Sequence, residues 1–139
     1  MYIMKSIVLL GLSLLVTFLS CTKRVESVSK DLRYRASLHK IDYDRSLTNA
    51  WKGDSISILL ISTLMLDGGL ISENGSQIIS IVDKIGEQKF CRVVHNCSPN
   101  DKQKIMINIS SGFDYTPIKK YEFQDLSKVF PLVFAELSR

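Results

Sequence analysis

Three side chains that could bind a metal or act as nucleophiles lie in the stretch CRVVHNC, residues 91 to 97. Cys91 and His95 are four residues apart, so a helix would place them on one face, with Cys97 shortly after. This spacing suits zinc ligation or a cysteine nucleophile activated by a histidine. A structural zinc site takes four protein ligands, and no fourth is evident because His39 is distant in the sequence. We therefore predict no metal site and no non-covalent cofactor.

The carboxylates of Asp42 and Asp44 flank Tyr43 and are a candidate acid–base pair. A glycosidase needs two acids on opposite sides of the substrate bond, and nothing in the sequence places a second acid in that way. Solvated positions or a helix cap explain these two residues better. The chain also lacks a glycine-rich phosphate loop, a helical His pair around a glutamate, a glycine-flanked serine and a calcium loop. We predict that the protein is not an enzyme.

Aromatic and basic residues crowd together between two predicted helices near the carboxyl end of the chain. If exposed, they would form a tyrosine-rich strip suited to binding a protein. The alternative is that they pack a loop onto the core, as buried aromatic residues commonly do. The candidate binding strip consists of Tyr115, Lys119, Lys120, Tyr121 and Phe123.

The composition is that of one folded domain. The 139 residues are 45% hydrophobic and 23% charged, which excludes intrinsic disorder, and there is no internal repeat. The net charge of +4 is too small to predict nucleic-acid binding. Basic residues cluster early in the chain, where they could be a solvated tether or could contact anionic lipid headgroups. They are Lys23, Arg24, Lys30, Arg33, Arg35 and Lys40.

Helical spacing of apolar residues recurs along most of the chain and predicts an all-α fold, a small bundle of four or five short helices. Residues 31–40 also alternate like a strand, but no partner strand is obvious, so we favour a helix there. An α+β fold with strands near 32–38 and 56–62 is the alternative. Asp54 or Ser55, Ser98 and Asp125 are expected N-caps, and Pro131 should kink or restart the last helix. The predicted helices are residues 46–51, 56–66, from 72 or 76 to about 95, 99–112 and 126–137.

The segment 56–66 is apolar nearly all round, which predicts the buried central element of the domain. We expect three parts in the whole chain: an export signal over 1–20, a polar and partly basic tether over 21–44, and one helical domain over 45–139.

The amino-terminal residues have the features of an export signal. One positive charge in residues 1–6 precedes thirteen mostly apolar positions, 7–19, which are fewer than the roughly 20 needed to span a bilayer. The sequence FLSC that follows resembles the lipobox of bacterial lipoproteins, with Phe18 at the usual leucine position. The resemblance covers residues 1–21 only and implies no fold or activity. It implies cleavage between Ser20 and Cys21, and covalent diacylglycerol and N-acyl lipid on Cys21.

The same resemblance predicts the location of the protein in the cell. Thr22 replaces the aspartate that retains many such proteins in the inner membrane, so we expect the outer membrane, with the protein facing the periplasm. Lys23 and Arg24 outnumber the single Lys5 before the apolar segment, which leaves an uncleaved anchor with a cytoplasmic domain as the alternative.

Lipidation of Cys21 would leave Cys91 and Cys97 as a pair in a compartment where disulfides persist. We predict a disulfide between them, with free buried thiols or a metal site as the alternatives.

These features together predict a lipid-anchored envelope protein that acts by protein–protein contact, as an immunity-type or accessory protein. Its partners would be the membrane, through the lipid anchor, and another protein. A structural subunit of an envelope complex and a hydrolase with an unrecognised site are the alternatives.

Overall fold

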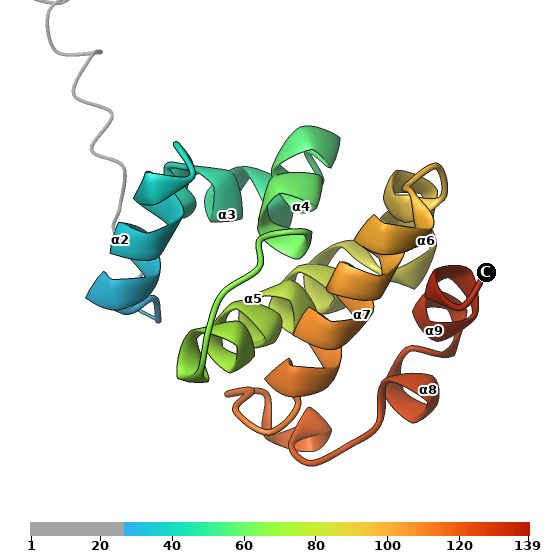
Figure 1. The fold of residues 1–139 in the computed structure, drawn as a ribbon. Helices are drawn as coiled ribbons and strands as arrows, with labels where there is room; N and C mark the ends of the chain where they lie inside the picture. The colour runs from blue at the N-terminus through green and yellow to red at the C-terminus, as the bar shows by residue number, and fades with distance from the viewer. Residues whose placement is uncertain (1–26) are drawn as a thin grey trace, which may run out of the picture.

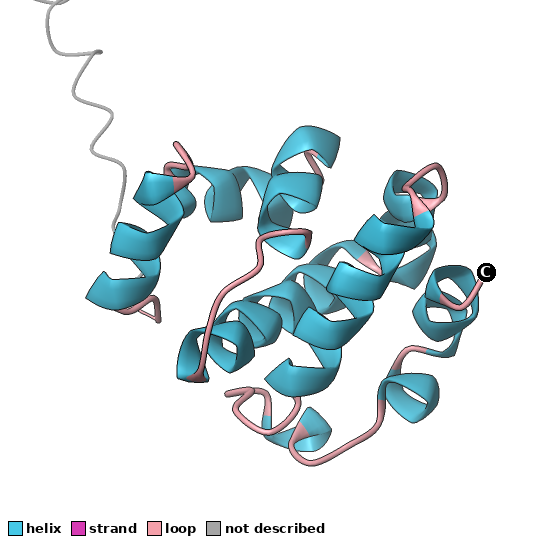
Figure 2. Cartoon of the chain, viewed as in Figure 1, coloured by secondary structure: helices cyan, strands magenta, loops and turns pink. Residues whose placement is uncertain are grey.

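The described part of the chain is entirely helical. The computed structural model describes residues 27–139, and these contain eight α-helices, one 3₁₀-helix and no strand (Figures 1 and 2). The predicted all-α fold is therefore confirmed, and the α+β alternative is wrong. The helices are α2 (Lys30–Leu38), α3 (Tyr43–Trp51), α4 (Ser55–Ser62), α5 (Gly69–Ile85), α6 (Glu87–Val94), α7 (Pro99–Gly112), η2 (Lys119–Tyr121, 3₁₀), α8 (Leu126–Val129) and α9 (Pro131–Leu137).

Several helices begin at a side chain that satisfies a free backbone N–H group. A serine or aspartate oxygen accepts a hydrogen bond from the backbone three residues later, at 2.8 Å for Asp54 and 3.1 Å for Ser98. These two predicted caps are confirmed. Asp42 caps α3 in the same way, which was one of the two roles expected for it. Asp125 stands at the N-cap position of α8 but makes no such bond.

Several helix boundaries differ from the predicted ones: α3 begins at Tyr43 rather than Ser46, and α5 begins at Gly69 rather than at 72 or 76. Helix α4 ends at Ser62 rather than 66, and an irregular segment leads to Gly68, which has a positive φ and precedes α5. The predicted helix ending near 95 is divided into α5 and α6 at Gly86, whose φ of 83° breaks the helical path. The last predicted helix is divided into α8 and α9 at Pro131, as its proline suggested.

Helices α5 and α7 form the most extensive helix pair of the domain. They can pack closely because a glycine on each helix faces the other. A Cβ atom added at Gly75 would overlap the backbone carbonyl of Asn108, and one added at Gly112 would overlap the backbone at Gly75. The two backbones are therefore in direct contact at this crossing.

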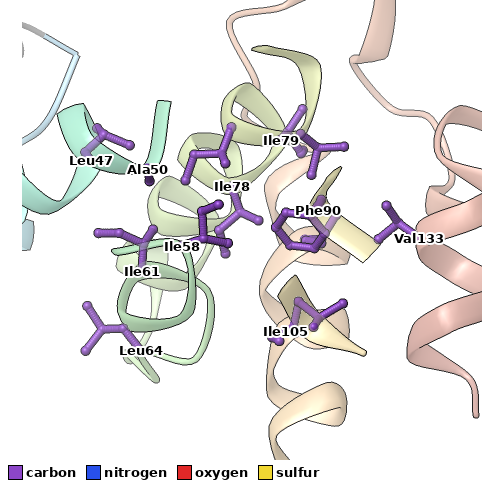
Figure 3. Packing of buried hydrophobic residues seen from close by; sticks show 14 of the residues in the cluster. Leu47, Ala50, Ile58, Ile61, Leu64, Ile78, Ile79, Phe90, Ile105 and Val133 are labelled. Carbon is purple, nitrogen blue, oxygen red and sulfur yellow. The ribbon is translucent and has the colours of Figure 1, made fainter. Parts of the chain in front are cut away.

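A single hydrophobic core joins the helices. Figure 3 shows buried side chains from α3 to α7 and from α9 gathered in one cluster. Each fully buried isoleucine or phenylalanine contributes about 1.5–3 kcal/mol relative to an exposed one. The largest fully buried apolar side chains include Leu32, Leu47, Ile58, Ile61, Ile78, Ile79, Ile81, Phe90, Ile105 and Ile109.

The folded domain begins earlier than the predicted boundary at residue 45. A helix was predicted over 31–40 and is found over 30–38, and Val28, Leu32 and Ala36 are buried in the core. The carboxylate of Glu73 on α5 accepts hydrogen bonds from the backbone N–H and the hydroxyl of Ser29, at 2.6 and 2.8 Å. Residues 28–44 are thus part of the domain, and any tether is confined to residues before them.

None of the helices within residues 27–139 is both long enough and apolar enough to cross a membrane.

Candidate functional site

Within the described residues, several ionisable side chains lie around Glu136 on α9. Its Oε1 accepts a hydrogen bond from Lys102 Nζ on α7 at 2.9 Å, and both residues are only 8% exposed. Lys102 Nζ also donates to the backbone carbonyl of Glu136 at 3.1 Å. His95 Nδ1 lies 3.1 Å from the same Oε1, and Arg139 Nη1 lies 3.4 Å from Oε2. We call these four residues the Glu136 cluster.

The electrostatics of the Glu136 cluster favour a structural role. The hydrogen bond from Lys102 is the main cause that lowers the pKa of Glu136, and the bond from His95 acts in the same direction. A carboxyl group with a lowered pKa is ionised at neutral pH and has no proton to give as a general acid. The cluster therefore serves as an ionic connection between α7 and α9.

Cys91 and Cys97 are free thiols in the structure, which does not contain the predicted disulfide. The two residues have different surroundings. Cys91 lies on α6 beside a shallow pocket that Glu136 and Arg139 also line, whereas Cys97 follows the helix and interacts electrostatically with Asp101.

Neither thiol has the lowered pKa that is typical of a cysteine nucleophile. Burial raises the pKa of Cys91, and the negative charges of Glu136 and Glu87 raise it further. Burial and the carboxylate of Asp101 raise the pKa of Cys97. A raised pKa keeps each thiol protonated at neutral pH, and the thiolate is the reactive form.

The structure does not assemble Cys91, His95 and Cys97 into a site. Within residues 27–139, no three His, Cys, Asp or Glu side chains are placed to hold a metal ion. His95 instead lies beside Glu136 on α9, a contact that no spacing rule within the sequence could have indicated.

The predicted binding strip is divided between two roles. Tyr121 packs edge-on against Phe130 with ring centroids 5.3 Å apart, and its hydroxyl donates to Asp83 on α5 at 2.7 Å. This hydrogen bond is the main cause that lowers the pKa of Asp83, and the ammonium of Lys120 lies 3.2 Å from the same carboxylate. Tyr121 thus holds the loop on the core.

The other members of the strip are exposed and lie apart from this contact. Lys119 is exposed, and so are Tyr115 and Phe123. Tyr115 belongs to a different surface, a pocket lined by Ser27 and Glu73 among others. None of the other four residues of the strip lines this pocket.

Helix α4 carries an exposed apolar surface that the sequence prediction missed. Ile58, Ile61 and Ser62 face the core, but Ile56 is 71% exposed and Leu60 also projects into solvent. The segment is apolar all round because one side fills the core and the other side forms part of the surface. The prediction of a wholly buried element is therefore wrong for this side of the helix.

A groove of about 320 Å³ adjoins this surface. It lies between the turn after α2, helix α4 with the segment that follows it, and helix α7. Its ionisable lining residues are His39 and Lys104, and no carboxylate lines it. We use the name α4 face for Ile56 together with the groove residues His39, Ile41, Leu60, Thr63, Leu64, Met65 and Lys104.

The predicted lipidation site, Cys21, and the predicted cleavage residue, Ser20, lie outside the described residues.

No protein-family model, curated protein or solved structure matches the chain.

Proposed function

We propose that this chain is a lipid-anchored protein of the bacterial cell envelope that acts through protein–protein contact, as an immunity-type or accessory protein. The sequence FLSC after a short apolar segment supports the anchor at Cys21. Thr22 supports an outer-membrane address facing the periplasm. The α4 face is the observation that supports protein contact.

The α4 face suits a binding surface because three of its apolar side chains, Ile56, Leu60 and Met65, are exposed to solvent. Ile56 and Leu60 are one helical turn apart and both exposed, while Met65 adds a third apolar side chain beside the groove. Contiguous exposed apolar residues next to a groove are typical of protein interaction sites.

The charges beside the groove indicate the chemistry of the partner. Lys104 is cationic, and its ion-pair partner Asp101 lies outside the groove, which no carboxylate lines. Lys104 also forms an ion pair with Asp101 at 2.9 Å, which leaves it held in a defined position. We therefore expect a protein segment with apolar side chains and at least one carboxylate.

The proposal of a non-catalytic role is supported by the state of the ionisable groups. The lowered pKa of Glu136 leaves it without a proton to give as a general acid, and the raised pKa values of Cys91 and Cys97 keep both thiols out of the reactive thiolate form. A structural subunit of an envelope complex would also use a contact face, whereas a hydrolase would not require one.

The anchor is tested by the intact mass of protein extracted from membranes. We expect the loss of residues 1–20 and the addition of acyl mass, and we expect a Cys21→Ser variant to stay unprocessed. A full-length chain without lipid would contradict the anchor and favour the uncleaved alternative.

The contact is tested by a photo-crosslinking amino acid placed at Leu60 in living cells, with Phe123 as the exposed control position outside the α4 face. We expect one crosslinked protein at position 60 that is absent at position 123 and lost on Ile56→Asp. An identical crosslinking pattern at both positions would contradict the proposal. Protection of cells from a toxin encoded by a neighbouring gene, lost in the same variant, would identify the immunity role.

A further inference from the structure

The outer face of α2 is a second exposed surface that the fold does not use. Leu32 and Ala36 point into the core, and the opposite side carries Tyr34 and Leu38, which are 63% and 59% exposed. These two residues are four apart, so they lie one helical turn from each other on the same side. An aromatic and an aliphatic residue are thus placed together in contact with solvent.

Basic residues stand at both ends of this face. Lys30 begins the helix one turn before Tyr34, and Lys40 follows Leu38 in the turn, and both are exposed. Asp31 is the one carboxylate of α2. Arg35, at the edge of the face, forms an ion pair with Asp67 at 2.7 Å.

This arrangement matches the requirements of a bilayer interface. Tyrosine is enriched at the level of lipid headgroups, where its ring is buried and its hydroxyl stays hydrated. Lysine side chains can bury their methylene groups and direct the ammonium group toward phosphate, and each such charge near an anionic surface contributes about 1 kcal/mol.

The short distance along the chain between α2 and the proposed lipid anchor indicates that the membrane covers this face. Ser27, the first described residue, is six residues after Cys21, so a fully extended chain would separate them by about 20 Å. Lys23 and Arg24 lie in that interval. Helix α2 and helix α9 lie at opposite ends of the molecule in Figure 1, so the membrane-proximal end is the one that carries α2.

We infer that the outer face of α2, formed by Lys30, Tyr34, Leu38 and Lys40, rests on the anionic headgroups of the membrane to which Cys21 is anchored. This inference rests on the proposed lipid anchor. It assigns the domain a fixed orientation, with α2 against the bilayer and α9 directed away from it.

The test measures which end of the lipidated protein touches lipid. Full-length protein is expressed with Trp51→Phe, which removes the single native tryptophan, and then with either Tyr34→Trp or Phe134→Trp. Phe134 is the matched control because it is an exposed aromatic residue on α9. Circular dichroism confirms that each variant is folded. The proteins are reconstituted into phosphatidylethanolamine–phosphatidylglycerol vesicles that contain brominated lipid.

We expect lipid bromines to quench the indole at position 34 at least twofold more than the indole at position 134. The combined substitutions Lys30→Glu and Lys40→Glu should reduce the quenching at position 34 to the control level. Equal quenching at both positions would overturn the inference, because the domain would then move freely on its tether. Intact mass of the same samples separates the two proposals: absence of acyl mass overturns the anchor, whereas acylated protein with equal quenching overturns only the orientation.

Discussion

At the scale of single residues, Asn74 on α5 is a completely buried polar side chain with hydrogen bonds to other helices. Its Oδ1 accepts a hydrogen bond from the hydroxyl of Tyr43 at 2.7 Å, and its amide donates to the carbonyl of Ile61 at 3.1 Å. Burial is the main cause that raises the pKa of Tyr43, so its hydroxyl remains a donor throughout the neutral range. Asn74 therefore connects α3 to the end of α4.

Replacing this side chain should destabilise the domain strongly. Asn74→Ala leaves a buried hydroxyl and a buried carbonyl without partners, and each costs about 1–3 kcal/mol. We expect a loss of roughly 2–4 kcal/mol in the free energy of unfolding, measured with urea. The exposed Asn96 supplies the matched control, Asn96→Ala, which should change stability by less than about 0.5 kcal/mol. Equal effects of both variants would refute this role.

For single residues, the sequence predicted correctly only those interactions whose two partners are close together in the chain. The caps at Asp54 and Ser98 could be recognised because a cap bonds to the backbone three residues away. The partners of His95, Tyr121 and Tyr43 lie 41, 38 and 31 residues away in the chain, beyond any spacing rule.

At the scale of helices, the contact between α5 and α7 depends on two glycines. Gly112→Ala introduces a Cβ atom that would overlap the backbone at Gly75, and neither helix can move without disturbing the core. Overpacking of this kind costs about 1–3 kcal/mol. We expect a loss of that size in the free energy of unfolding.

The helical glycine Gly69 is a suitable control for this substitution. Nothing lies within 4 Å of a Cβ atom added there, and alanine is the better helix former. Gly69→Ala should therefore leave stability unchanged or raise it slightly. If Gly112→Ala behaved like Gly69→Ala, the close approach of the two helices would be disproved.

The connection between α7 and α9 should depend on pH in a defined direction. Because the folded state lowers the pKa of Glu136 below its ordinary value of 4.5, its contribution to stability is complete above that pH. This contribution is lost as the pH falls below about 4.5 and through the lower folded pKa. Other carboxyl groups with lowered pKa values, such as Asp83 and Asp101, titrate in the same window.

Comparison with Glu136→Gln isolates this one group. We expect the wild type to be more stable than Glu136→Gln at pH 7, and the difference to shrink steadily as the pH falls below 4.5. The measurement is urea unfolding across pH 2–7. A difference that does not vary with pH would contradict the ionic role of the carboxylate.

At the scale of the whole molecule, the proposed address depends on the residue after the lipidated cysteine. Thr22→Asp should shift the protein from the outer to the inner membrane in an organism with two membranes, because it restores the retention residue of the lipoproteins that the leader resembles. Density-gradient fractionation of the envelope measures the change, and Thr22→Ser is the control that should not move. Wild-type protein found in the inner membrane would refute the outer-membrane proposal.

The two proposed surfaces would bind different partners. The outer face of α2 would meet the bilayer, and the α4 face would meet a protein partner. Each centres on a helix in the amino-terminal half of the described chain, α2 or α4. The carboxyl-terminal helices close the core and hold it with the Glu136 cluster.

The sequence by itself determined the all-α class, because the 3.6-residue periodicity and the caps are local properties of the chain. Only the tertiary structure decided where the domain begins and which side of α4 is exposed, since burial depends on helices distant in sequence. It also decided the state of Cys91 and Cys97, because a bond between thiols requires their side chains to meet in space. Helix periodicity indicates that a face is apolar, but packing alone decides whether that face is covered.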